Sequence, residues 1–131
     1  MALLVSRPLI AWLIHEAQTA APEECCGILL GTGNSIDRAV PTANVAEDRR
    51  RRFEIDPQAL IDAHRHARAG GPQVLGYYHS HPNGPAAPSA VDAALAAGDG
   101  MIWAIIGETD VTFWRDEEPG FVPLSTTLED R

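Results

Sequence analysis

Three short apolar runs limit most strongly what this chain can fold into. Cys25–Leu30 and Met101–Ile106 are almost continuously apolar, and Val74–His81 is rich in aromatic and apolar residues. Runs of this length are typical of strands that are buried within a sheet. Pro57–Ala69 and Ser89–Ala97, which lie between these runs, have the composition and boundaries of helices. The pattern therefore predicts strands of one sheet connected by helices.

Further segments complete this pattern. Pro8–Ala20 carries apolar residues at helical spacing and has proline at the position suited to a first turn. Ile36–Val45 and Arg52–Ile55 are predicted to be strands, and Val111–Trp114 and Phe121–Leu124 are predicted to form a closing hairpin or two edge strands. Helices that alternate with strands and end in hairpins indicate an α/β fold, with an α/β/α sandwich around a mixed β-sheet.

Length and composition favour one domain. A chain of 131 residues is large enough to bury a core without staples, so we expect a single domain over residues 1–131 with no linker. Apolar residues make up 45% and charged residues 21%, as in ordinary globular proteins. The net charge of −8 argues against nucleic acid as a partner, because binding to phosphates depends on an excess of basic residues.

The first residues and the cysteines indicate the compartment. The apolar start of the chain is interrupted by Arg7 and Pro8 and has no basic segment before it, so we expect neither a signal peptide nor a membrane anchor. Instead, the start is expected to belong to an amphipathic first helix. Cys25 and Cys26 are adjacent in a predicted strand and cannot form an ordinary disulfide with each other. Together these features predict a cytoplasmic protein.

Two histidines and an aspartate have the spacing of metal ligands. His79 and His81 lie two residues apart on a predicted strand, so both imidazoles leave the same face. Asp92 follows in the first turn of the next helix, where the helix dipole favours a carboxylate that can face back across the loop. Two imidazoles and one carboxylate, with a fourth position left open, are the ligand set of a catalytic zinc site. A structural interpretation of Asp92 stays open, because Ser89-Ala-Val-Asp92 also fits a helix capping box.

The same residues belong to a longer pattern. His79-Ser-His81-Pro is followed after six residues by Ser89-Ala-Val-Asp92, and Pro22–Gly31 upstream reads P-x-E-x-C-G-x-L-x-G. This arrangement resembles the JAMM/MPN+ (Mov34/PAD-1-like) zinc metallopeptidases of the stand-alone prokaryotic type, and the resemblance extends over nearly the whole chain. It implies a cytidine-deaminase-like fold and one Zn²⁺ per chain, bound by His79, His81 and Asp92.

The resemblance also implies roles for the other site residues. Glu24 would be the general base and Ser89 a hydrogen-bond donor to the oxyanion, in a hydrolase that cuts a peptide or isopeptide bond. Glu23 competes with Glu24, because the sequence alone does not show which carboxylate faces the metal; the family register favours Glu24. The implied substrate is a ubiquitin-like or sulfur-carrier protein with a Gly-Gly end. No membrane partner is expected, and a homodimer is left open.

Two other classes of function compete with this interpretation. A non-catalytic scaffold of the MPN type is similar in fold but lacks the metal ligands that this chain has. A zinc-dependent hydrolase of the deaminase type is related in architecture, but its H-x-E and P-C-x-x-C signature is absent from the sequence.

Several other residues have side chains that could bind a metal, attack a substrate or carry charge to a partner. Cys25 and Cys26 could act as ligands or nucleophiles, but small core residues are the simpler interpretation. His15 lacks the second histidine of an H-E-x-x-H zinc helix, and His64 and His66 point apart on a predicted helix. Arg49–Arg52 is most simply an exposed polar turn, although four positive charges in an acidic protein could also steer an acidic partner.

Overall fold

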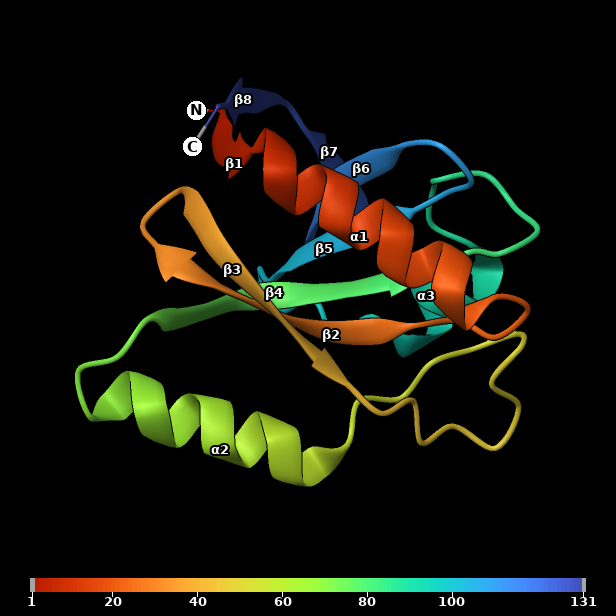
Figure 1. The fold of residues 1–131 in the computed structure, drawn as a ribbon. Coiled ribbons are helices and arrows are strands. Elements are labelled where there is room, and N and C mark those ends of the chain that lie inside the picture. The colour runs from red at the N-terminus through yellow and green to blue at the C-terminus, as the bar shows by residue number, and fades with distance from the viewer. Residues whose placement is uncertain (1, 131) are drawn as a thin grey trace.

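A computed structural model describes residues 2–130, so Met1 and Arg131, the two ends of the predicted domain, lie outside the described residues. Within this range the chain forms one mixed sheet with helices on both faces (Figure 1). The helices are α1 (Arg7–Ala20), α2 (Pro57–Arg68) and α3 (Ala90–Leu95). The strands are β1 (Leu3–Ser6), β2 (Cys26–Thr32), β3 (Ser35–Thr42), β4 (Gln73–Ser80), β5 (Ile102–Ile106), β6 (Val111–Asp116), β7 (Phe121–Leu124) and β8 (Thr126–Glu129).

The order of strands across the sheet is β7-β6-β5-β4-β2-β3-β1-β8. β4 lies near the middle, antiparallel to β2 and parallel to β5. In this register His79 is opposite Cys26 on one side and Ile105 on the other. The prediction of an α/β fold with a mixed sheet is confirmed. It places the histidine pair at the end of a central strand that is hydrogen-bonded on both sides.

Two apolar clusters hold the helices to opposite faces of the sheet. Leu13 and Ala17 of α1 pack in the larger cluster, which includes Tyr78 of β4. Ala59, Leu60 and Ala63 of α2 pack against a second cluster that contains Cys26, Ile28, Leu30 and Ile55. The layers are therefore helix, sheet, helix, and each face of the sheet is covered because neither could remain in water without cost.

Both ends of the described chain differ from the prediction. The start was assigned to the first helix, but Leu3–Ser6 forms β1, which pairs in parallel with β3 and β8. Ser6 then caps α1, since its side chain accepts a hydrogen bond from the amide of Leu9. Thr126–Glu129 forms strand β8 at the edge of the sheet, which was not predicted. Its residues are mostly exposed, so the sequence lacks the alternation of apolar and polar residues that marks a strand.

The predicted strand Arg52–Ile55 is wrong. Only one isolated bridge forms there, between Asn44 and Ile55. Oδ1 of Asn44 accepts hydrogen bonds from the backbone amides of Ala46 and Glu54. This side-chain oxygen takes the place of the carbonyls that a neighbouring strand would supply. β3 likewise ends at Thr42 rather than Val45.

Smaller differences concern the boundaries next to the histidine pair. β4 ends at Ser80, so His81 lies one residue beyond the strand, although its amide still donates to the carbonyl of Ile106. α3 is shorter than predicted and ends at Leu95. No helix within residues 2–130 is long and apolar enough to cross a membrane.

Candidate metal centre

The three predicted ligands converge at one point, where β4 ends and α3 begins. His79 is the penultimate residue of β4, His81 follows the strand, and Asp92 lies in the first turn of α3. His79 and Asp92 are buried, with 0% and 3% of their surface exposed. A Pro- and Gly-containing loop from Pro82 to Pro88 connects the strand to the helix. Because this loop is short, the strand end and the helix start stay close together.

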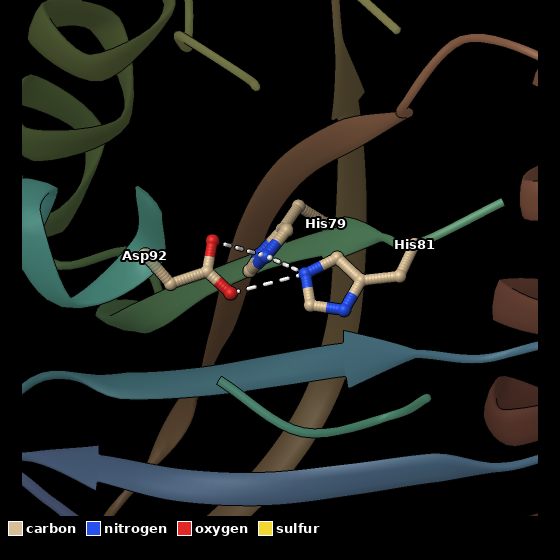
Figure 2. A group of neighbouring side chains, drawn as sticks. All are labelled: His79, His81 and Asp92. Atoms are coloured by element: carbon tan, nitrogen blue, oxygen red, sulfur yellow. Dashed lines mark hydrogen bonds and ion pairs between the residues drawn. The ribbon is translucent and has the colours of Figure 1, made fainter. Parts of the chain in front are cut away.

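The ligand atoms form a compact triangle (Figure 2). The Nε2 atom of His79 lies 3.1 Å from Nε2 of His81 and 3.0 Å from Oδ1 of Asp92. The Nε2 atom of His81 lies 3.0 Å from Oδ2 of Asp92. Zinc binds histidine nitrogen and carboxylate oxygen at about 2.0–2.2 Å, so neighbouring ligands of one ion lie close to each other. The group therefore has both the chemistry and the proximity of a site for one metal ion.

Hydrogen bonds satisfy this triangle only when His81 is protonated on both nitrogens. His81 Nδ1 lies 2.9 Å from the carbonyl oxygen of Pro85, which can only accept, so Nδ1 carries the proton. Nε2 of neutral His81 then presents a lone pair to the carboxylate of Asp92 and to Nε2 of His79. Two lone pairs facing each other repel unless a positive charge lies between them. A second proton on His81, or one metal cation shared by the three side chains, removes this conflict.

The pKa values of the three groups reflect their burial and their contacts with one another. Burial lowers the pKa of His79, which favours the neutral form that binds metals. Burial also lowers the pKa of His81, but hydrogen bonds to Asp92 and Pro85 outweigh it and the net shift is upward. For Asp92, burial raises the pKa, yet hydrogen bonds from both histidines and from the Ser89 amide hold it well below its usual range. Asp92 is therefore ionised although it is buried.

Glu24, rather than Glu23, faces this group. Glu24 is 7% exposed, and its Oε1 atom is buried without a hydrogen-bond partner among the described residues. Burial raises the pKa of Glu24 to about 7, and the charge of His81 opposes that rise. Glu23 instead points to the outer turn, where its Oε2 lies 3.3 Å from Nε of Arg49. The structure therefore separates two carboxylates that the sequence left as competitors.

Ser89 is the N-cap of α3, as one of the sequence interpretations held. Its Oγ accepts from the amide of Asp92, and Oδ2 of Asp92 accepts from the amide of Ser89, both at 3.0 Å. The capping box therefore exists and also orients the carboxylate of Asp92 toward His81. A serine hydroxyl can donate as well as accept, so the Ser89 hydrogen remains available to a ligand.

Aromatic residues hold the ring of His79. Phe53 stacks on it with centroids 4.2 Å apart and planes 15° apart, and Trp103 meets it edge-on at 5.5 Å. Nδ1 of His79 is buried and has no hydrogen-bond partner among the described residues. In a metal-binding histidine, the N–H of the second ring nitrogen ordinarily donates a hydrogen bond to an acceptor. Here the stacked ring of Phe53 and the perpendicular ring of Trp103 fix its orientation instead.

Asn44 was not identified from the sequence, yet it organises the segment around Glu24. Its Nδ2 donates to the carbonyls of Glu24 and Arg52 at 3.0 and 3.1 Å, and its Oδ1 accepts two further amides. All of its hydrogen-bonding capacity is used. Asn44 lies near the end of the predicted strand Ile36–Val45, and an asparagine there does not differ in sequence from one that begins an ordinary turn.

The other candidate residues lie outside the metal group. Cys26 is buried in the core and Cys25 is half-buried beside the other cluster; both are free thiols, and burial raises the pKa of each. Their interpretation as small core residues is confirmed. His64 and His66 lie on α2 and His15 on α1, and none joins a metal-binding group within the described chain.

A hollow of about 330 Å³ opens beside this group. The three candidate residues Glu24, His81 and Ser89 line it together with Arg50 and Arg51. The rest of the lining comes from the loop and the start of α3: Pro82, Asn83, Gly84, Pro85, Ala87, Pro88 and Val91. A second hollow of about 690 Å³ lies on the other side of the same loop and is also lined by His81.

The model of one protein family, prokaryotic homologs of the JAB domain, matches residues 6–117. The desampylase of Haloferax volcanii is 32% identical over 125 residues, which cover 89% of this chain and 88% of that protein. The chain belongs to the family of prokaryotic homologs of the JAB domain, and the resemblance to stand-alone prokaryotic JAMM/MPN proteins is confirmed.

Two further similarities agree with this assignment. A probable TtuB-protein conjugate cleaving protease of Thermus thermophilus is 34% identical over 92 residues, or 70% of this chain and 62% of that protein. The solution structure of a protein from Desulfitobacterium hafniense superimposes with a TM-score of 0.85 at 26% identity, covering 98% of this chain and 94% of the other. The fold is therefore shared over nearly the full length.

Proposed function

We propose that this protein is a zinc-dependent peptidase or isopeptidase that hydrolyses the amide bond after the C-terminal Gly-Gly of a ubiquitin-like or sulfur-carrier protein. One observation carries the proposal: three buried or half-buried ligand atoms about 3 Å apart, with the buried carboxylate of Glu24 facing them. The relatives named desampylase and TtuB-protein conjugate cleaving protease support this class of substrate.

His79, His81 and Asp92 would hold one zinc ion. A zinc ion with an open position supplies Lewis acidity and lowers the pKa of water toward about 7. The strand, the capping box and the stacking of Phe53 hold the three side chains in this arrangement. Little rearrangement is therefore needed on binding.

Glu24 would act as the general base and then as the general acid. Its raised pKa of about 7 allows it both to take a proton at neutral pH and to return it. Oε1 has no partner within the described chain that would compete for the proton. Glu24 would take a proton from the attacking water and deliver it to the leaving amine.

Ser89 would stabilise the oxyanion that forms on the scissile carbonyl. Its hydroxyl lies at the hollow that Glu24 and His81 also line, and its hydrogen is not used in the capping box. A hydrogen bond that strengthens as negative charge develops lowers the barrier more than it improves substrate binding.

Ser89→Ala is expected to lower kcat by about 10²–10³ with a smaller change in KM, as when an oxyanion donor is removed. The variant also loses the N-cap, which costs about 1 kcal/mol of folding stability. Steady-state kinetics should therefore be measured together with a thermal melt. Ser89→Thr keeps both a cap and a donor and serves as the matched control. If kcat were unchanged while the melting temperature fell, Ser89 would act only as a cap.

The hollow beside the metal group favours a substrate without bulky side chains. Glycines, which carry no side chain, could approach His81 and Ser89 most closely. An extended Gly-Gly end would reach these residues more easily than a segment with large side chains.

A fusion of a ubiquitin-like carrier with cysteine or a peptide after its Gly-Gly end is expected to be cut directly after the second glycine. The reaction is followed by the mass of the product, with and without a chelator. Cleavage at this bond that the chelator abolishes would support the proposal. Efficient hydrolysis of unrelated small amides, without cleavage of any such fusion, would contradict it.

Zinc content and ammonia release, measured beside this cleavage, separate the two alternative functions. A scaffold would bind no zinc and cleave nothing, and a deaminase would release ammonia from a nucleobase. The cytidine-deaminase-like architecture, the homodimer and the cytoplasmic location stay predictions, and native mass spectrometry can test the dimer.

A further inference from the structure

Two arginines belong to the hollow at the metal group. Arg50 and Arg51 line it together with Glu24, His81 and Ser89. These arginines and Glu24 are the three charged side chains of its lining. The larger hollow on the far side of the loop has a single charged lining residue, Glu108. The lining of the hollow beside Ser89 therefore carries two positive side chains and one carboxylate, in a chain whose net charge is −8.

The backbone places these arginines by direct connection to Glu24. The amide of Glu24 donates to the carbonyl of Arg49 at 2.7 Å. Asn44 then bridges the carbonyls of Glu24 and Arg52 with its Nδ2 atom. Arg50 and Arg51 thus lie between two residues that are both tied to the peptide of Glu24. Their attachment points are fixed relative to this carboxylate, unlike those of an independent surface turn.

The charges of this pair are available to a ligand. Arg50 makes no ion pair with any described residue. Arg51 lies 3.7 Å from Asp48, with 82% of its side chain exposed, and such exposed pairs contribute little. Arg49, in contrast, is turned to Glu23. An arginine guanidinium presents a planar fork of donors that matches a carboxylate.

The lining of the hollow indicates where that carboxylate lies in a substrate. Arg50 and Arg51 line the same hollow as Ser89 and His81, beside the bond that would be cut. The side chains of a Gly-Gly end carry no carboxylate. The nearest carboxylate of such a substrate is then on the leaving side.

We propose that Arg50 and Arg51 bind the free α-carboxylate of the leaving group, so that the enzyme prefers a carrier bearing a single C-terminal amino acid. This inference rests on the proposed function, since it assumes cleavage after Gly-Gly. It adds a specificity on the other side of the bond. A lysine side-chain conjugate, whose α-carboxylate is engaged in a peptide bond, is then a poorer substrate of the same site.

The test compares two carrier fusions that end in Gly-Gly-Ala, one with a free carboxylate and one with a C-terminal amide. The wild type is expected to cleave the carboxylate form with a kcat/KM about five- to tenfold higher, the effect of two partly exposed charge contacts. In the double variant Arg50→Gln, Arg51→Gln this preference should fall to about one, mainly through KM. Arg68→Gln on α2 is the matched control and should keep the preference. Thermal melts confirm that each variant is folded.

The outcomes separate this inference from the proposed function. Equal cleavage of the two fusions by the wild type, or a preference that survives in the double variant, would overturn the role of the arginines and leave cleavage after Gly-Gly intact. Failure to cut either fusion, with zinc bound, would instead refute the proposed function. A third fusion, ending in Gly-Gly-Ala-Glu-amide, places the carboxylate on a side chain one residue further on. If it were preferred over the free-carboxylate fusion, an acidic side chain rather than an α-carboxylate would be the ligand.

Discussion

Glu24→Gln is expected to lower turnover by about 10²–10⁴ while one zinc ion per chain remains bound, because the change removes a proton acceptor and no ligand. Glutamine has nearly the same shape, so the buried position of Glu24 can stay filled. The burial that raises the pKa of the carboxyl to about 7 favours a neutral side chain, so folding stability should hold. Single-turnover kinetics on the carrier fusion, together with metal analysis of the same sample, check both parts.

Glu23→Gln is the matched control for this experiment. Glu23 is adjacent in sequence, yet its carboxylate pairs with Arg49 at the surface. Turnover should change little, as exposed ion pairs contribute about 0–1 kcal/mol. If Glu23→Gln removed activity and Glu24→Gln did not, the base would be the other carboxylate and the assignment would be off by one residue.

His79→Ala is expected to abolish both zinc binding and cleavage. The variant leaves two ligands for the ion and opens a space between Phe53 and Trp103, where the imidazole ring now packs. Metal content per folded chain, by mass spectrometry after gel filtration, gives the result. His64→Ala, which changes a half-buried histidine of α2 outside the metal group, should keep its zinc.

If the His79→Ala variant bound as much zinc as the wild type, the proposed metal site would be wrong. Because His79 is fully buried, loss of metal through unfolding must be distinguished from loss of a ligand. A far-ultraviolet circular dichroism spectrum like that of the metal-free wild type would assign the loss to the ligand.

The metal group was predictable because its geometry is local. His79 and His81 share a face through the period of a strand, and Asp92 returns to them through one short loop and a helix start. The α/β order of the central elements was predictable for the same reason, since long apolar runs mark buried strands. The distant run Pro22–Gly31 was still needed to favour a metal site over a simple capping box at Asp92.

The rest depends on contacts between distant segments. The stacking of Phe53 on His79 and the bridge from Asn44 to Glu24 join residues 26 and 20 positions apart, and no periodicity marks them. The structure distinguishes Glu24 from Glu23 because only Glu24 is buried. Two adjacent residues of the same type give no indication in the sequence of which one is buried. Leu3–Ser6 was too short a run to separate from the helix that begins at Arg7.

The most direct measurement is the return of activity when zinc is added to metal-free wild-type protein, with a carrier ending in Gly-Gly followed by one amino acid as substrate. One site formed by His79, His81 and Asp92 predicts that cleavage after the second glycine is absent without metal, rises linearly with added zinc and stops rising at about one equivalent per chain. Cleavage that persists in metal-free protein, or that requires a second equivalent, would contradict a hydrolase with a single metal ion at these three residues.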